Sequence, residues 1–81
     1  MTKENYQRAA MINMKLTALQ REREIWENCN GCTINVYSRV YGSTGNYNPD
    51  SIYINFERLK QEALNTIDSV TKSLQNEFSD L

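Results

Sequence analysis

Two long segments with helical periodicity flank a central stretch rich in turn-forming and β-branched residues, and this division constrains the fold most. In residues 4–28, apolar residues recur at steps of three and four. The row consists of Ala9, Ile12, Leu16, Leu19 and Trp26, with Arg23 in the remaining position. Because good helix formers fill most other positions, residues 4–28 are predicted to form one helix.

A second apolar row runs along the same predicted helix, one residue step or roughly 100° from the first. It consists of Met11, Met14, Ala18 and Ile25. The apolar arc is therefore wider than one partner helix needs, which predicts a homo-oligomer formed through helix faces. A helix of a host protein is the alternative occupant. Arg23 and Glu27 are spaced to form an ion pair, and Gly31 is expected to end the helix in the left-handed conformation.

Residues 56–79 are predicted to form a second helix, because their apolar residues follow a nearly heptad repeat. The row comprises Phe56, Leu59, Ala63, Ile67, Val70, Leu74 and Phe78, and continues to Leu81. Asn55 is a suitable N-cap, and Asp68 is spaced to pair with Lys72. Two apolar rows of similar length predict a mainly α fold, with two long antiparallel helices in a helical hairpin of coiled-coil character.

Residues 29–55 lie between the helices, and a structureless loop of that length is unusual in a small domain. Residues 33–41 alternate between apolar and polar positions, and residues 51–54 are rich in β-branched residues. The sequence "GSTGNYNPD" between them has turn chemistry. A β-hairpin or ordered loop is therefore expected here, with strands at 33–41 and 51–54. In the alternative, residues 51–55 belong to the second helix.

Composition excludes several classes of protein. The 81 residues suffice for a single domain, residues 1–81, with a small core. A net charge of −1, with acidic and basic residues interspersed, argues against nucleic-acid and anionic-membrane partners. No apolar run approaches the ~20 residues that cross a bilayer, and the first ten residues lack the apolar core of a signal peptide. A cytoplasmic protein is therefore expected.

Catalytic groups are scarce, so the protein is expected not to be an enzyme and to need no cofactor. Histidine, the commonest general base and metal ligand, is absent from the sequence. The serines lie outside any nucleophile-elbow context, and "GSTGN" lacks the lysine of a phosphate-binding loop. Most acidic residues fall on predicted solvent faces, where they are expected to be hydrated.

Cys29 and Cys32 form the one CxxC motif. A single motif supplies two thiolates, whereas a structural zinc ion takes four ligands, so an intersubunit zinc site would need a second chain. A redox disulfide is another interpretation, but the βαβ setting of such motifs is missing. We favour two reduced cysteines beside the end of a helix, with no bound metal.

The Tyr-rich central stretch is the best candidate for a binding surface. The candidate binding residues are Tyr37, Arg39, Tyr41, Ser43, Thr44, Asn46 and Tyr47. Tyrosine provides rigid contact area and serine and asparagine provide adaptable hydrogen bonds, as in protein-binding loops. The same residues suit a small anionic ligand, with tyrosines stacked on a base and Arg39 on a phosphate. Ordinary hairpin chemistry explains the composition equally well.

Two other functions are alternatives to a binding protein. A DNA-linked regulatory helical dimer would require a basic face; Arg8 and Lys15 share one, but Glu4 and Glu22 lie on it too. A zinc-linked structural assembly module would use Cys29 and Cys32.

The layout resembles that of short helical accessory proteins of unknown function from phages and prophages of low-GC bacteria. The likeness lies in the helix "NYQRAAMINMKLTALQRE", the Gly/Ser/Asn-rich break and the helix "ERLKQEALNTIDSVTKSL". It implies a small accessory protein in the host cytoplasm that inhibits or sequesters a host factor, either a protein or a small nucleotide signal. It implies no site residues.

Overall fold

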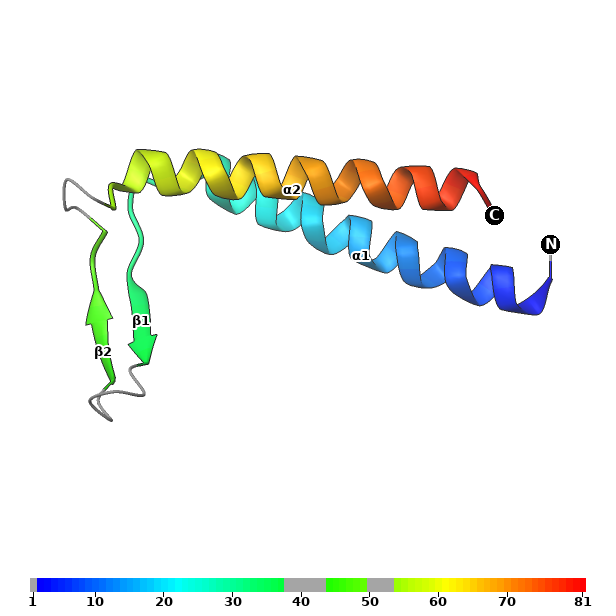
Figure 1. Ribbon diagram of the computed structural model, residues 1–81, viewed down its shortest axis with the longest axis horizontal. Coiled ribbons are helices and arrows are strands. Elements are labelled where there is room, and N and C mark those ends of the chain that lie inside the picture. Colours follow the sequence, from blue (N-terminus) through cyan, green and yellow to red (C-terminus); the bar gives the residue numbers. More distant parts are fainter. Residues whose placement is uncertain (1, 38–43, 50–53) are drawn as a thin grey trace.

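The computed structural model describes residues 2–37, 44–49 and 54–81. Its elements are α1 (Lys3–Asn28), β1 (Ile34–Tyr37), β2 (Thr44–Tyr47) and α2 (Phe56–Ser79). The helices run antiparallel along the long axis, and the strands form an arm that projects from one end, while both termini lie at the other end (Figure 1). The predicted arrangement of two helices with a β-hairpin between them is confirmed, and the helix bounds agree to within one residue.

Both helices begin at a side-chain cap. Thr2 Oγ1 accepts a hydrogen bond from the Asn5 amide at 3.1 Å. Asn55 Oδ1 accepts one from the Arg58 amide at 2.9 Å, which confirms the predicted cap. The predicted end of the first helix is wrong in one respect, because Gly31 does not adopt the left-handed conformation. Instead the chain leaves α1 through an extended residue, Cys29, at φ −86° and ψ 146°.

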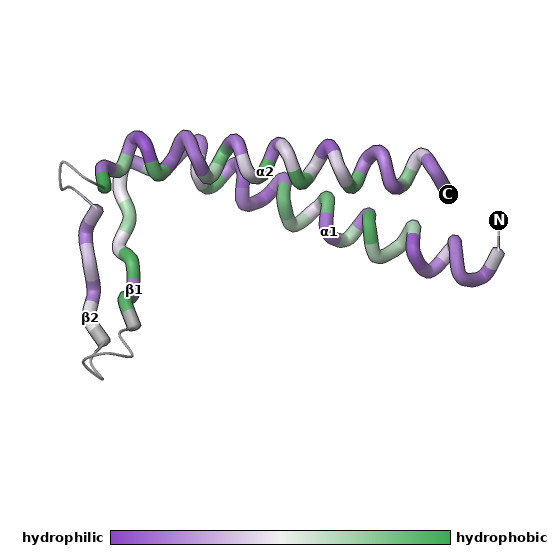
Figure 2. Tube along the Cα trace, viewed as in Figure 1, coloured by the Kyte–Doolittle hydropathy of each residue, from purple (hydrophilic) through white to green (hydrophobic). Residues whose placement is uncertain are grey.

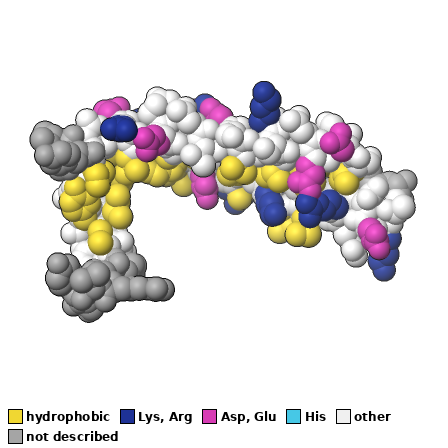
Figure 3. Space-filling model, viewed as in Figure 1, with side chains coloured by type: hydrophobic (Ala, Val, Ile, Leu, Met, Phe, Trp, Pro, Cys, Tyr) yellow, Lys and Arg dark blue, Asp and Glu magenta, His cyan; other side chains and the backbone are white. Residues whose placement is uncertain are grey.

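The core is a narrow seam between the helices. Ile12 of α1 and Ile67 of α2 are its most buried side chains, with 2% and 6% of their surface exposed. Leu16, Leu19, Trp26, Leu59, Ala63 and Leu74 are half-buried around them. Hydrophobic and hydrophilic positions alternate along both helices (Figure 2), and hydrophobic side chains line the lower edge of α2 (Figure 3). The seam leaves Val70 and Phe78 exposed, so α1 covers only part of the apolar face of α2.

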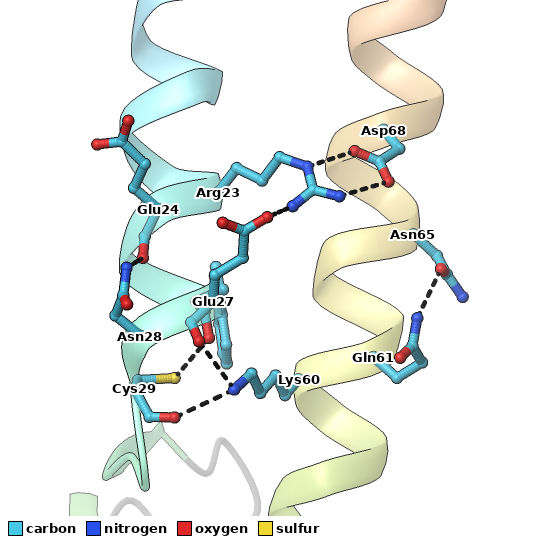
Figure 4. A network of polar contacts seen from close by, with 10 residues as sticks. Arg23, Glu24, Glu27, Asn28, Cys29, Lys60, Gln61, Asn65 and Asp68 are labelled. Atoms are coloured by element: carbon cyan, nitrogen blue, oxygen red, sulfur yellow. Dashed lines mark hydrogen bonds and ion pairs between the residues drawn. The ribbon is translucent and has the colours of Figure 1, made fainter.

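Arg23 interrupts the apolar row of α1 and joins the two helices (Figure 4). Its Nε lies 2.8 Å from Asp68 Oδ1 and its Nη2 lies 3.2 Å from Asp68 Oδ2, and the same guanidinium pairs with Glu27. The predicted pair between Arg23 and Glu27 is confirmed. The predicted pair between Asp68 and Lys72 is wrong, because both carboxylate oxygens of Asp68 accept hydrogen bonds from Arg23 on the other helix.

The strands pair antiparallel, but the second strand does not lie where the sequence predicted it. β2 is Thr44–Tyr47, within the segment expected to be a turn, and Ile54 of the predicted strand 51–54 lies in a bend. Residues 38–41 and 51–53 of the two predicted strands fall outside the described residues. The opposed residues are Ile34–Tyr47, Asn35–Asn46, Val36–Gly45 and Tyr37–Thr44. Pairing with the β-branched residues of β1 outweighs the poor strand propensity of Gly45 and Asn46.

The molecule is extended. Its Cα radius of gyration is 17.2 Å, against about 12 Å for a compact chain of this length. Within the described residues, the helices approach each other and the strands approach each other, but neither strand lies against a helix. The arm therefore stands clear of the helical seam.

Replacing Ile67 should destabilise the fold strongly. Ile67→Ala is expected to lower the free energy of unfolding by about 2–4 kcal/mol, because it leaves a cavity in a core with few buried side chains. Val70→Ala, on the same helix, is the matched control and should cost less than about 1 kcal/mol, since Val70 is 42% exposed. Chemical denaturation followed by circular dichroism measures both. Equal losses would contradict a core centred on Ile67.

Candidate functional site

The arm has two chemically different faces. Residues directly opposite each other in an antiparallel ladder share a face, and neighbours along a strand alternate. Ile34, Val36 and Tyr47 therefore lie on one face, whereas Asn35 and Asn46 lie on the other. Val36 is 46% exposed; it lies opposite Gly45, and no helix lies against the described strands. One face is thus largely apolar and the other carries amide groups.

Some of the candidate binding residues lie on the strands, and the others fall outside the described residues. Tyr37, Thr44, Asn46 and Tyr47 belong to the strands. Arg39, Tyr41 and Ser43 fall outside the described residues, so their role stays a prediction. Asn46 is exposed and Tyr47 is half-buried, and the register sets them on opposite faces. A partner that covers one face therefore does not meet both.

Sequence reasoning missed the exposed apolar side chain of Val36. The alternation of residues 33–41 assigned Ile34 and Val36 to one side of a strand, but it did not show what would lie across from them. Val36 lies opposite Gly45, and the register that opposes them depends on where β2 begins.

The base of the arm is closed by a side-chain hydrogen bond. The Thr33 hydroxyl donates to Asn48 Oδ1 at 3.1 Å, which links the two legs of the arm just outside the strands. Pro49, the next residue, is buried. An open groove follows, lined by residues 30–33, Asn48, Pro49 and Phe56. Figure 3 shows hydrophobic side chains gathered at the inner corner where the arm meets α2.

Lys60 of α2 holds the end of α1 beside the arm. Its Nζ donates to the carbonyl oxygen of Glu27 at 3.2 Å and to that of Cys29 at 3.3 Å (Figure 4). Carbonyl groups at the end of a helix lack intrahelical donors, and the last turn of α1 contains no basic residue. Lys60 supplies both a donor and the positive charge that favours a helix C-terminus. It thereby fixes the point where the chain leaves the helical pair toward the arm.

Cys29 and Cys32 are free thiols, and both are half-buried. The Cys29 thiol donates to the Trp26 carbonyl oxygen at 3.1 Å, an ordinary contact at a helix end. In the part of the chain that the structure describes, no three Cys, His, Asp or Glu side chains gather closely enough to hold a metal ion.

Ion pairs between the helices lower the positive potential of the face considered for DNA. Arg8, one of its two basic residues, pairs with Glu77 of α2. Lys15, the other, lies on the same face as two glutamates. The described geometry thus offers little support for a DNA-linked regulator, which needs several phosphate contacts.

No family model, no curated protein and no solved structure matches the chain. Among the described residues, neither helix is apolar enough over a sufficient length to cross a membrane. The arm is the strongest candidate site, because its paired strands stand apart from the helices and leave apolar surface exposed.

Lys60→Met should destabilise the protein by about 1 kcal/mol, because two carbonyl groups at the end of α1 lose their donor. Lys72→Met removes the same charge from α2 at an exposed position and should change stability by less than about 0.5 kcal/mol. Urea denaturation of the two variants gives the comparison. If both changes have the same effect, Lys60 does not anchor the end of α1.

Proposed function

We propose that this protein is a non-enzymatic binding module. It acts by binding a partner through its β-hairpin arm, without catalysing a reaction. The isolation of the arm carries the proposal. Within the described residues, β1 and β2 pair with each other and no helix lies against them. A lone two-stranded hairpin is marginally stable in water, because three strands or a packed face are normally needed. A partner seated on the arm would provide those contacts.

Two properties of the strands suit a protein partner. The face with Ile34 and Val36 offers apolar surface around Gly45, where no side chain rises from the backbone. The two-stranded sheet also has two edges, and a sheet edge is where an extended segment of a partner can add as a further strand. An extended segment of a partner would pair with an edge through its backbone and cover Val36 with its side chains.

The side chains of the arm support a role in binding without a catalysed reaction. The chain contains no histidine, and the described strands carry amide, hydroxyl and apolar side chains rather than acid–base pairs. The resemblance in layout to phage accessory proteins supports the same role, namely inhibition or sequestration of a host factor. A host protein suits the apolar face best. A small nucleotide signal is the alternative, held by Arg39 and the neighbouring tyrosines.

Photo-crosslinking tests whether the arm meets a partner. A benzoylphenylalanine at position 36 should capture one defined protein in the cells that produce this chain, whereas the same residue at position 72 on α2 should not. Capture at both positions alike would contradict a role specific to the arm.

Binding of the captured protein should then depend on the arm. Val36→Asp should weaken it at least tenfold, because a carboxylate would be buried in an apolar contact. Arg39→Ala combined with Tyr41→Ala should weaken it as well, while Lys72→Ala should leave it unchanged. Isothermal titration measures the affinities, and circular dichroism should show unchanged helicity because the strands stand clear of the helices. Wild-type affinity in both arm variants would overturn the proposed function.

A further inference from the structure

The outward side of α1 carries an apolar row that no described residue covers. Met11, Met14 and Ile25 are 51%, 73% and 67% exposed, and Ala18 between them is exposed too. Their spacing of three, four and seven residues aligns them on one side of the helix. Ile12, which is buried against α2, lies on a different side. Figure 3 shows hydrophobic side chains on the side of α1 away from α2.

The shape of the surface at this row is that of a helix–helix contact. A shallow hollow beside it is lined by Asn13, Met14, Thr17, Ala18 and Arg21. Positions 14, 17, 18 and 21 have the i, i+3, i+4, i+7 spacing of the four residues that receive one side chain in knobs-into-holes packing. Because the Ala18 side chain is small, a second helix can approach the centre of the row closely.

The exposed area of the chain is large enough to include a missing interface. The molecule exposes 6787 Å², whereas a compact monomer of 9.4 kDa exposes about 5,000 Å². A standard stable interface buries about 800 Å² on each partner. The excess of roughly 1,800 Å², to which the extended shape of the molecule also contributes, is larger than the area that one such interface removes from each partner.

The charged residues beside the row favour a second copy of the chain, packed antiparallel, as the occupant of this face. Ala18 lies seven residues from both Met11 and Ile25, and nearly midway between Lys15 and Glu22. Two copies packed antiparallel about Ala18 would place Lys15 of each beside Glu22 of the other, since these two share one flank of the row. A parallel pair would instead set Arg21 against its own copy. No ion pair of the described residues involves Lys15 or Glu22, so both are free for this contact.

We propose that the outward row of α1, formed by Met11, Met14, Ala18 and Ile25, is a homodimer interface on which a second copy packs antiparallel. The resulting dimer is a bundle with the two α1 helices at its centre and the arms at opposite ends. Each Cys29 lies eleven residues from Ala18, so the two CxxC motifs would be about 33 Å apart along the axis. The dimer therefore does not depend on a shared zinc ion.

Sedimentation of the full chain over a concentration series tests the interface. The wild type should be a dimer with or without a chelator. Met14→Glu combined with Ile25→Glu should weaken the dimer at least about a hundredfold, because carboxylates would be buried in apolar contacts. Tyr6→Glu is the matched control, an exposed apolar side chain of α1 outside the row, and should remain dimeric. A monomeric wild type, a dimer lost on chelation, or a double variant that stays dimeric would overturn the proposal.

A charge exchange tests the direction without disturbing the apolar row. Lys15→Glu alone and Glu22→Lys alone should each weaken the dimer roughly three- to tenfold, because two like-charged contacts replace two ion pairs. The two changes together should restore it, since the pairs re-form with their signs exchanged. In a parallel dimer the two positions lie about 10 Å apart along the axis, so no restoration is expected. Absence of restoration would therefore overturn the antiparallel arrangement.

The proposed dimer interface and the proposed function of the arm can be contradicted independently of each other. The Val36→Asp variant should remain dimeric, because Val36 lies on β1 and not on α1. A dimer without any partner captured at position 36 would contradict the proposed function and leave the interface intact. A monomer whose arm still captures its partner would contradict the interface alone.

Discussion

The rest of the structure depends on the narrow contact between α1 and α2. Ile12 and Ile67 are its deepest side chains, and half-buried leucines continue it on both sides. Polar contacts between the helices flank this small buried seam. Arg23 and Asp68 set one helix against the other in the middle, and Lys60 fastens the end of α1 to α2 where the arm departs.

Helices were predictable from the sequence because their signal is local and repeated. The apolar rows of residues 4–28 and 56–79, with Asn55 as a cap, define both helices to within one residue. The interhelical contacts were not predictable in the same way. Whether Asp68 meets Lys72 on its own helix or Arg23 on the other depends on how the two helices slide along each other, and no local pattern encodes that alignment.

The candidate site was harder to predict for a related reason. A strand is defined by what pairs with it, and β2 contains Gly45 and Asn46, whose propensities favour a turn. Once β1 offers a partner, the backbone pairs there in spite of those residues. The register then sets Gly45 opposite Val36 and places Asn46 and Tyr47 on opposite faces. None of this follows from the residues of either strand taken alone.

Three surfaces with different chemistry thus lie on different elements: the seam, the outward side of α1 and the arm. Each has its own side chains, since the residues buried in the seam are not those of the outward row, and neither helix lies against the described strands. Changes on one surface therefore need not disturb the others, which is a useful property in a protein of 81 residues.

The polar contacts between the helices also imply an order of assembly. Lys60 meets Glu27 across 33 residues of chain, Arg23 meets Asp68 across 45, and Arg8 meets Glu77 across 69. The entropy cost of closing a loop rises with its length, so the contact nearest the arm is the least costly to form first. Each contact made then shortens the loop that the next must close. The helices should zip together from the arm toward the termini, and should fray in the opposite order.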